Sequence, residues 1–183
     1  MSQVALWFER KFEFAFPADH WPNICMRLRG APPRLEELLR DRPHDLLTRR
    51  PQPGKWSIQE HAGHLADLEP LWRARVGDFE AGSEKMTVAD LANRGTEAAR
   101  HNQRDLKQIL SDFRRARLAM VDHVEALAVE SPSVETPASR LFSRAIPHPR
   151  LQQPMRLVDH LYFVAEHDDH HLARMWELLR KPA

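Results

Sequence analysis

Apolar residues recur along much of this chain at the three- and four-residue spacing of amphipathic helices. The pattern over 21–39 predicts a first helix, which the stretch Gly30-Ala31-Pro32-Pro33 must kink or restart, because proline disrupts a helix interior. A second helix is predicted to begin at Ser57-Ile58-Gln59-Glu60, which has the form of a capping box, and to loosen over 77–82, which begins and ends with glycine. Residues 41–55 contain three prolines and no apolar period, so we expect a loop there.

Two longer amphipathic patterns follow. The stretch 97–128 predicts a third helix, because its apolar side chains share one face: Leu106, Ile109, Leu110, Phe113, Met120, Val121, Val124 and Leu127. The stretch 155–180 predicts a fourth helix with a similar stripe: Leu157, Leu161, Val164, Leu172, Met175 and Leu179. Between them, residues 131–154 contain five prolines and are expected to form a long crossover, which is uncommon enough to suggest a functional lining.

Four amphipathic helices with almost no strand pattern predict an all-α fold, a four-helix bundle with a long crossover before the last helix. The 183 residues suit one domain with a substantial core better than two domains. Aromatic and charged residues alternate over 11–16 and predict a short extended segment closed by Pro17. Residues 1–16 are therefore expected to be an N-terminal extension within a single domain spanning 1–183.

Composition and charge limit which binding partners and which cellular compartment we expect for the chain. Lys and Arg total 27 against 26 Asp and Glu, so the formal charge of +1 provides no global field that would attract nucleic acid or an anionic membrane. No stretch is apolar enough to predict a transmembrane helix or a signal peptide. Cys25 is the only cysteine, which excludes an intramolecular disulfide and a cysteine-based zinc cluster and fits a reducing cytoplasm. The 11 histidines stand out against a single tyrosine, because imidazole is both a base and a good metal ligand.

The last predicted helix carries His167 and His171 one turn apart, on the border of its apolar stripe. Their Cβ atoms should be about 5 to 6 Å apart, so one metal ion can bridge the two imidazoles. His170 points away from the stripe, and His160, roughly 10 Å along the axis from His167, can line a pocket but cannot share the ion. The competing interpretation is a solvated helix face, but an unpaired imidazole beside the apolar stripe would cost free energy.

A third ligand should come from another helix, and the second helix offers His61 and His64. His61 sits nearer the centre of the apolar face and His64 on its border, so periodicity does not choose between them. Three neutral imidazoles leave a divalent ion with positive charge and at least one open position, as in catalytic zinc sites. Such an ion would lower the pKa of a bound water or thiol.

The segment 55–67, Lys-Trp-Ser-Ile-Gln-Glu-His-Ala-Gly-His-Leu-Ala-Asp, together with His-Asp-Asp-His-His at 167–171, resembles the DinB/YfiT-like family of metalloenzymes. The resemblance spans the chain from about Pro17 to its C-terminus. It implies a four-helix bundle, often dimeric, with a divalent metal held by three histidines near one end. The residues that match the family ligands are His64, His167 and His171.

The resemblance also implies a function. Family members with known activity include thiol S-transferases, so we expect a divalent-metal-dependent enzyme, either a thiol S-transferase or a small-molecule hydrolase. The expected cofactor is zinc or nickel, although imidazole also accepts cobalt, iron and copper. The expected partners are a small-molecule substrate, a low-molecular-weight thiol as co-substrate and a second copy of the chain in a homodimer. The alternative is a non-catalytic metal-containing binding or stress-response protein, in which the protein would enclose the metal fully.

Several side chains near these motifs carry further expectations. Asp67, three residues after His64, is the favoured carboxylate to orient a ligand histidine, ahead of Glu60 and Asp168. Cys25 is expected to be a small buried apolar residue. Three tryptophans are expected in the core rather than at a substrate: Trp56, Trp72 and Trp176. The stretch His148-Pro149-Arg150 is expected to form a turn, although its arginine could face an anionic substrate.

Overall fold

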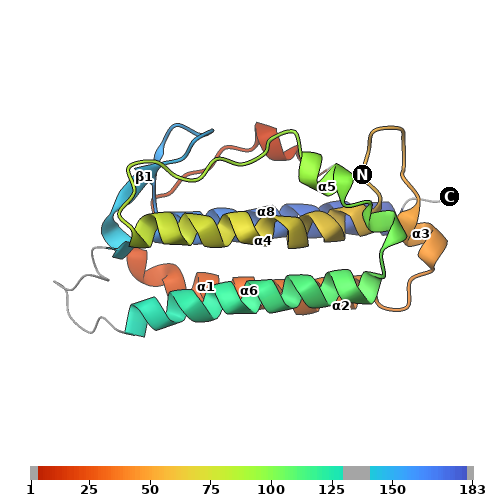
Figure 1. Cartoon of the computed structure of the whole chain (residues 1–183), viewed down its shortest axis with the longest axis horizontal. Coiled ribbons are helices and arrows are strands. Elements are labelled where there is room, and N and C mark those ends of the chain that lie inside the picture. The colour runs from red at the N-terminus through yellow and green to blue at the C-terminus, as the bar shows by residue number, and fades with distance from the viewer. Residues whose placement is uncertain (1–3, 130–140, 181–183) are drawn as a thin grey trace.

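Two layers of long helices make up the computed structural model, which describes residues 4–129 and 141–180 (Figure 1). One layer holds α4 (Ile58–Glu80) and α8 (Leu157–Arg180), which lie side by side. The other holds α6 (Leu106–Val129) beside the consecutive helices α1 (Trp21–Arg29) and α2 (Ala31–Leu39). With α1 and α2 taken as one broken helix, this is the predicted four-helix bundle.

The break between α1 and α2 falls at Gly30, as the sequence predicts. Pro32 and Pro33 lie in the first turn of α2, where a backbone N–H has no partner within the helix, so proline costs nothing there. The start of α4 also agrees with prediction. Ser57 accepts a hydrogen bond from the amide of Glu60, and the Glu60 carboxylate accepts one from the amide of Ser57 at 2.8 Å.

The third long helix begins later than the sequence predicts. Residues 97–128 were expected to be continuous, but α5 (Arg94–Ala98) and the 3-10 turn η3 (His101–Gln103) precede α6. Arg100 interrupts the helix with a φ of 47°, and the Asp105 side chain then caps α6 by accepting from the amide of Lys107 at 3.0 Å. The interruption turns the segment with Thr96 and His101 back against α4.

The connections are more ordered than their composition suggests. The predicted loop at 41–55 contains the short helix α3 (His44–Thr48). Part of the predicted crossover, 131–140, lies outside the described residues, and its remainder forms an antiparallel hairpin of β1 (Ala145–Pro147) and β2 (Pro154–Arg156). The turn of that hairpin spans residues 148–153 and includes His148-Pro149-Arg150, which were expected to form a turn.

The segment before α1 runs across the helices rather than away from them. It contains η1 (Trp7–Glu9) and η2 (Ala18–His20), and its aromatic side chains pack against the main apolar core: Trp7, Phe12, Phe14 and Phe16. The part predicted to be extended, 11–16, is indeed non-helical. This segment therefore forms part of the packed structure.

A buried ion cluster links three helices. The Arg117 guanidinium of α6 is fully buried and pairs with Glu69 of α4, at 2.6 Å between Nη2 and Oε1, and with Asp168 of α8. Burial without these carboxylates would be very costly for a guanidinium, so the cluster fixes the relative positions of the helices. Within the described residues, no helix is long and apolar enough to cross a membrane.

Candidate metal centre

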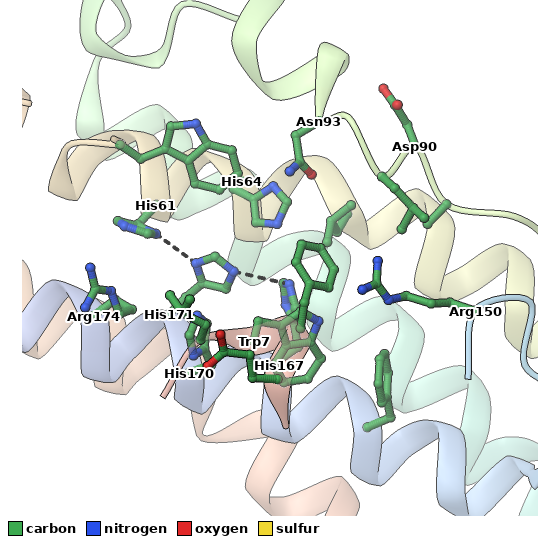
Figure 2. A pocket seen from close by; sticks show the side chains of 18 of the residues that line it. Trp7, His61, His64, Asp90, Asn93, Arg150, His167, His170, His171 and Arg174 are labelled. Atoms are coloured by element: carbon green, nitrogen blue, oxygen red, sulfur yellow. Dashed lines mark hydrogen bonds between the residues drawn. The ribbon is translucent and has the colours of Figure 1, made fainter. Parts of the chain in front are cut away.

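Three histidines from α4 and α8 converge inside the bundle: His64, His167 and His171 (Figure 2). Each offers a ring nitrogen that lies within 4.8 Å of the other two, and all three side chains are buried. Nε2 of His167 and Nε2 of His171 are 3.2 Å apart. The structure thus brings together the three residues that the resemblance selects.

The spacing suits a metal ion. Two imidazole nitrogens bound tetrahedrally to zinc, at about 2.0 to 2.1 Å each, would lie about 3.3 Å from one another. The 3.2 Å between the two Nε2 atoms is close to that value. Buried, neutral imidazoles with converging lone pairs are also the donor set that zinc and nickel accept. The residues present therefore fit a divalent metal.

His64 is oriented by Thr96, a residue that the sequence-based interpretation missed. Nδ1 of His64 lies 3.0 Å from the Thr96 hydroxyl oxygen. Although burial opposes it, hydrogen bonds from His101 and then from the Thr96 hydroxyl lower the pKa of Asp67. Since the Thr96 proton points to Asp67, its oxygen accepts the Nδ1 proton of His64, which leaves the lone pair on Nε2 of His64 for a metal.

Asp67 therefore has a different first partner from the one expected. The sequence predicts that its carboxylate orients a ligand histidine. In the structure, Oδ2 of Asp67 lies 2.8 Å from Nε2 of His101, and Thr96 links Asp67 to His64. The physical reason is that α5, which holds Thr96, and η3, which holds His101, both pack against α4.

Gly63 makes that arrangement possible. A Cβ atom at this position would lie 2.1 to 2.4 Å from three atoms of the His101 ring, which is fully buried. Only a residue without a side chain leaves room for the ring against α4. The glycine beside His64 in the sequence motif is thus explained by the packing of a residue 38 positions away.

His61 contacts His171 and is not one of the three clustered histidines. Its Nδ1 lies 2.9 Å from Nδ1 of His171, so the pair shares one proton (Figure 2). When His171 donates that proton, its Nε2 keeps the lone pair that faces His167. The position of His61 near the centre of the apolar face of α4 was the signal that it points inward.

Burial keeps these rings neutral. It lowers the pKa of His64 to about 4 and the pKa of His61 to about 3. It also lowers the pKa values of His167 and His171 well below the ordinary value, and neighbouring histidines add to the effect. At neutral pH the imidazoles are therefore in the form that can donate a lone pair.

The three histidines lie in the wall of a cavity of about 1040 Å³. Its apolar lining includes Trp7, Trp56 and Trp72, so two of the tryptophans expected in the core also face this space. Trp7 comes from the N-terminal segment, and its ring lies edge-on to His167 with centroids 5.1 Å apart. No sequence pattern near residue 7 indicated that contact.

Other expected site residues have different surroundings. His170 lines the cavity beside Trp7, whereas His160 is fully buried between Trp72 and Phe79 and is not among the residues that line it. Glu60 pairs with Arg50 and caps α4, and Asp168 pairs with Arg117, so each carboxylate is engaged away from the three histidines.

The structure also bears on what the sequence predicts for Cys25 and Trp176. Cys25 is buried as expected, and burial raises the pKa of its thiol to about 12, which makes it a poor nucleophile. Trp176 was expected in the core but is half exposed, with the Arg180 guanidinium 4.5 Å from its ring centroid. Its position on the outer side of α8 explains the error.

The fold and the cluster together define a helical bundle whose long helices converge on three histidines, and sequence comparison identifies the family. A sequence model of the DinB superfamily matches residues 27–175, so the chain belongs to this superfamily. Among solved structures, YfiT from Bacillus subtilis is similar with a TM-score of 0.72 and 18% sequence identity, over 94% of this chain and 93% of that chain. It is described as a probable metal-dependent hydrolase with an unusual four-helix bundle topology. No curated protein sequence matches the chain.

Proposed function

We propose that this chain is a divalent-metal-dependent enzyme that acts on a small molecule, with His64, His167 and His171 as the metal ligands. The observation that carries the proposal is the position of the three histidines in the wall of a cavity of about 1040 Å³. A metal held there would face a space large enough for a small-molecule ligand. A metal with a purely structural role would instead be enclosed by protein ligands on all sides.

The residues around the ligands would support that chemistry. Thr96 and His61 hold the Nδ1 protons of His64 and His171, so that the Nε2 atoms of both ligands stay free. Trp7, Trp56 and Trp72 provide an apolar lining that limits water around the site. When bound, the metal would lower the pKa of a water or a thiol near neutral pH, which suits hydrolysis or thiol transfer.

Both reaction classes belong to the proposal. The description of YfiT as a probable metal-dependent hydrolase supports hydrolysis, whereas the resemblance to thiol S-transferases supports transfer of a low-molecular-weight thiol. Zinc and nickel are the metals proposed, because both accept histidine nitrogens. The expected homodimer and the cytoplasmic location stay predictions.

Metal analysis tests the ligand set. Purified protein should contain about one divalent metal per chain. Replacing any one of the three histidines with alanine should remove most of it, while His170→Ala, which changes another histidine of the same helix, should retain it. Loss of metal in His170→Ala with retention in His167→Ala would contradict the proposed ligands.

An activity panel tests the enzyme itself. The metal-loaded protein is mixed with small esters and amides, and separately with electrophiles and several low-molecular-weight thiols. Turnover should require the metal and should be abolished in His64→Ala. A panel without metal-dependent turnover, on protein that holds its metal, would instead support the non-catalytic binding protein.

A further inference from the structure

Among the residues that the structure describes, two arginines are almost completely buried, and their surroundings differ. Arg117 is fully buried and is held by two carboxylates, Glu69 and Asp168. Arg75 of α4 is 1% exposed, yet none of the carboxylates in the described residues lies within ion-pair distance of it. A buried guanidinium without a counter-charge is costly, so its position calls for an anion.

The guanidinium of Arg75 makes few contacts that compensate its charge. Nε donates to the carbonyl oxygen of Thr87 at 2.9 Å, and Cζ lies 5.4 Å from the ring centroid of Trp72. The Asp78 carboxylate raises its pKa from a distance, but burial has the larger effect and lowers the pKa of Arg75 to about 10. One neutral carbonyl and one aromatic face leave most of the charge unpaired.

The neighbour of Arg75 is a second donor. Nδ1 of His148 lies 3.3 Å from the amide nitrogen of Arg150 and 3.1 Å from that of Leu151, so Nδ1 accepts hydrogen bonds. The proton of the neutral ring is then on Nε2, which lies 3.1 Å from Nη1 of Arg75. Two N–H donors therefore face one another, and an oxyanion beside them would accept from both.

These donors belong to the cavity that holds the three histidines. Arg75, His148 and the exposed Arg150 all line it, and the Arg150 side chain is directed toward its interior (Figure 2). Trp72 is the link between the two parts, because its ring contacts Arg75 on one side and lies 5.5 Å from the His167 ring centroid on another. Arg75 and His167 therefore both lie against the same indole ring.

We infer that Arg75 and His148 form a binding subsite for a small oxyanion, such as a carboxylate or a sulfonate, within this cavity. Its role in substrate choice rests on the proposed function: a substrate or thiol that reaches the metal would place its anionic group beside Trp72, at the Arg75 end of the same cavity. Oxyanion binding itself does not depend on the metal. Guanidinium groups suit this task because their planar edge donates two parallel hydrogen bonds to such oxygens.

Binding of methanesulfonate to the full chain tests the subsite. The probe is titrated into 15N-labelled protein, with and without zinc, and the indole N–H signal of Trp72 is followed after assignment with Trp72→Phe. Methanesulfonamide, which is neutral and of similar shape, is the control ligand. We expect saturable shifts with methanesulfonate that methanesulfonamide does not cause.

Matched arginine variants locate the effect. Arg75→Gln should weaken methanesulfonate binding by about tenfold or more, because a charge-assisted hydrogen bond is lost. Arg73→Gln makes the same charge change on the exposed side of the same helix and should bind like the parent protein. Should Arg75→Gln fail to fold by circular dichroism, Arg75→Lys is used and should weaken binding at least threefold. Equal affinity in a folded Arg75 variant, or equal shifts with the neutral ligand, would overturn the inference.

The two proposals fail separately. Zinc binding without methanesulfonate binding would overturn the subsite and leave the proposed metal site intact. Methanesulfonate binding without zinc binding would overturn the proposed metal site and leave the subsite intact. If the protein is active, two pairs of compounds test whether it prefers an anionic substrate. One pair is 2-mercaptoethanesulfonate and 2-mercaptoethanol; the other is an ester that carries a free carboxylate and the neutral methyl ester of the same compound. Arg75→Gln should remove the preference for the charged member of one of these pairs; no preference in either pair would overturn the role in substrate choice.

Discussion

Replacing Gly63 with alanine should destabilise the protein, although the same change usually stabilises a helix. In a helix interior, alanine is favoured over glycine by up to about 1 kcal/mol. At Gly63, however, the new methyl would lie 2.1 Å from Cγ of His101, so the ring must move. Overpacking of this kind costs about 1 to 3 kcal/mol, and the displaced His101 also loses its 2.8 Å hydrogen bond to Asp67.

The net effect follows from these terms. Loss of a hydrogen bond to a charged group costs about 1.5 kcal/mol or more, so Gly63→Ala should lower the free energy of unfolding by about 2 kcal/mol or more. For a chain of this size, each kcal/mol corresponds to roughly 2 to 4 °C in melting temperature. Displacement of His101 should also disturb Asp67 and Thr96 and therefore weaken zinc binding through His64.

Gly77 provides the matched control, because it lies in the same helix and a Cβ there would contact nothing within 4 Å. Urea unfolding of the two variants should give changes of opposite sign, with Gly77→Ala stabilised by up to about 1 kcal/mol. In a His101→Ala background, Gly63→Ala should lose most of its cost. Stabilisation of both variants alike would refute the steric reasoning.

Three further predictions concern other buried groups. His61→Ala should leave one metal per chain but weaken its affinity about 10- to 100-fold, measured by competition with a chelator, because His171 loses its orienting partner. Arg117→Met should destabilise the protein by about 3 to 5 kcal/mol in urea, because two buried carboxylates lose their counter-charge. Burial lowers the pKa of His160 to about 3, so the unfolded chain binds a proton below about pH 6.5 that the folded chain refuses. Stability should therefore fall from pH 7 to pH 5, and His160→Leu should reduce that fall by about 2 kcal/mol; an unchanged fall would contradict the last prediction.

Local patterns in the sequence were sufficient for the bundle. The capping box at Ser57 and the prolines after Gly30 act within one helical turn, and both appear in the structure where they were predicted. The start of the third helix was wrong because Arg100 adopts a left-handed conformation that nothing in its side chain announces. Tertiary packing of His101 against Gly63 is what stabilises that interruption.

Part of the site could likewise be predicted from local spacing along one helix. His167 and His171 are one turn apart, so their juxtaposition follows from helix geometry alone, and His64 was selected by resemblance. Thr96 and Trp7 reach the site through contacts between distant parts of the chain, which no helical period encodes. Asp67 was predicted to orient a ligand histidine, but its link to His64 through Thr96 could not be predicted, because Thr96 comes from another segment.

The position of Trp7 shows that the wall of the cavity and the candidate metal ligands come from different parts of the chain. The candidate ligands come from α4 and α8, whereas part of the wall in front of them comes from a segment that precedes every long helix. Changes in residues 4–9 can therefore alter the size and shape of the cavity while leaving the candidate metal ligands in place. For protein engineering, this short segment is where selectivity can be varied at the smallest cost to the bundle, and it is also where a fused affinity tag would most directly obstruct ligand entry.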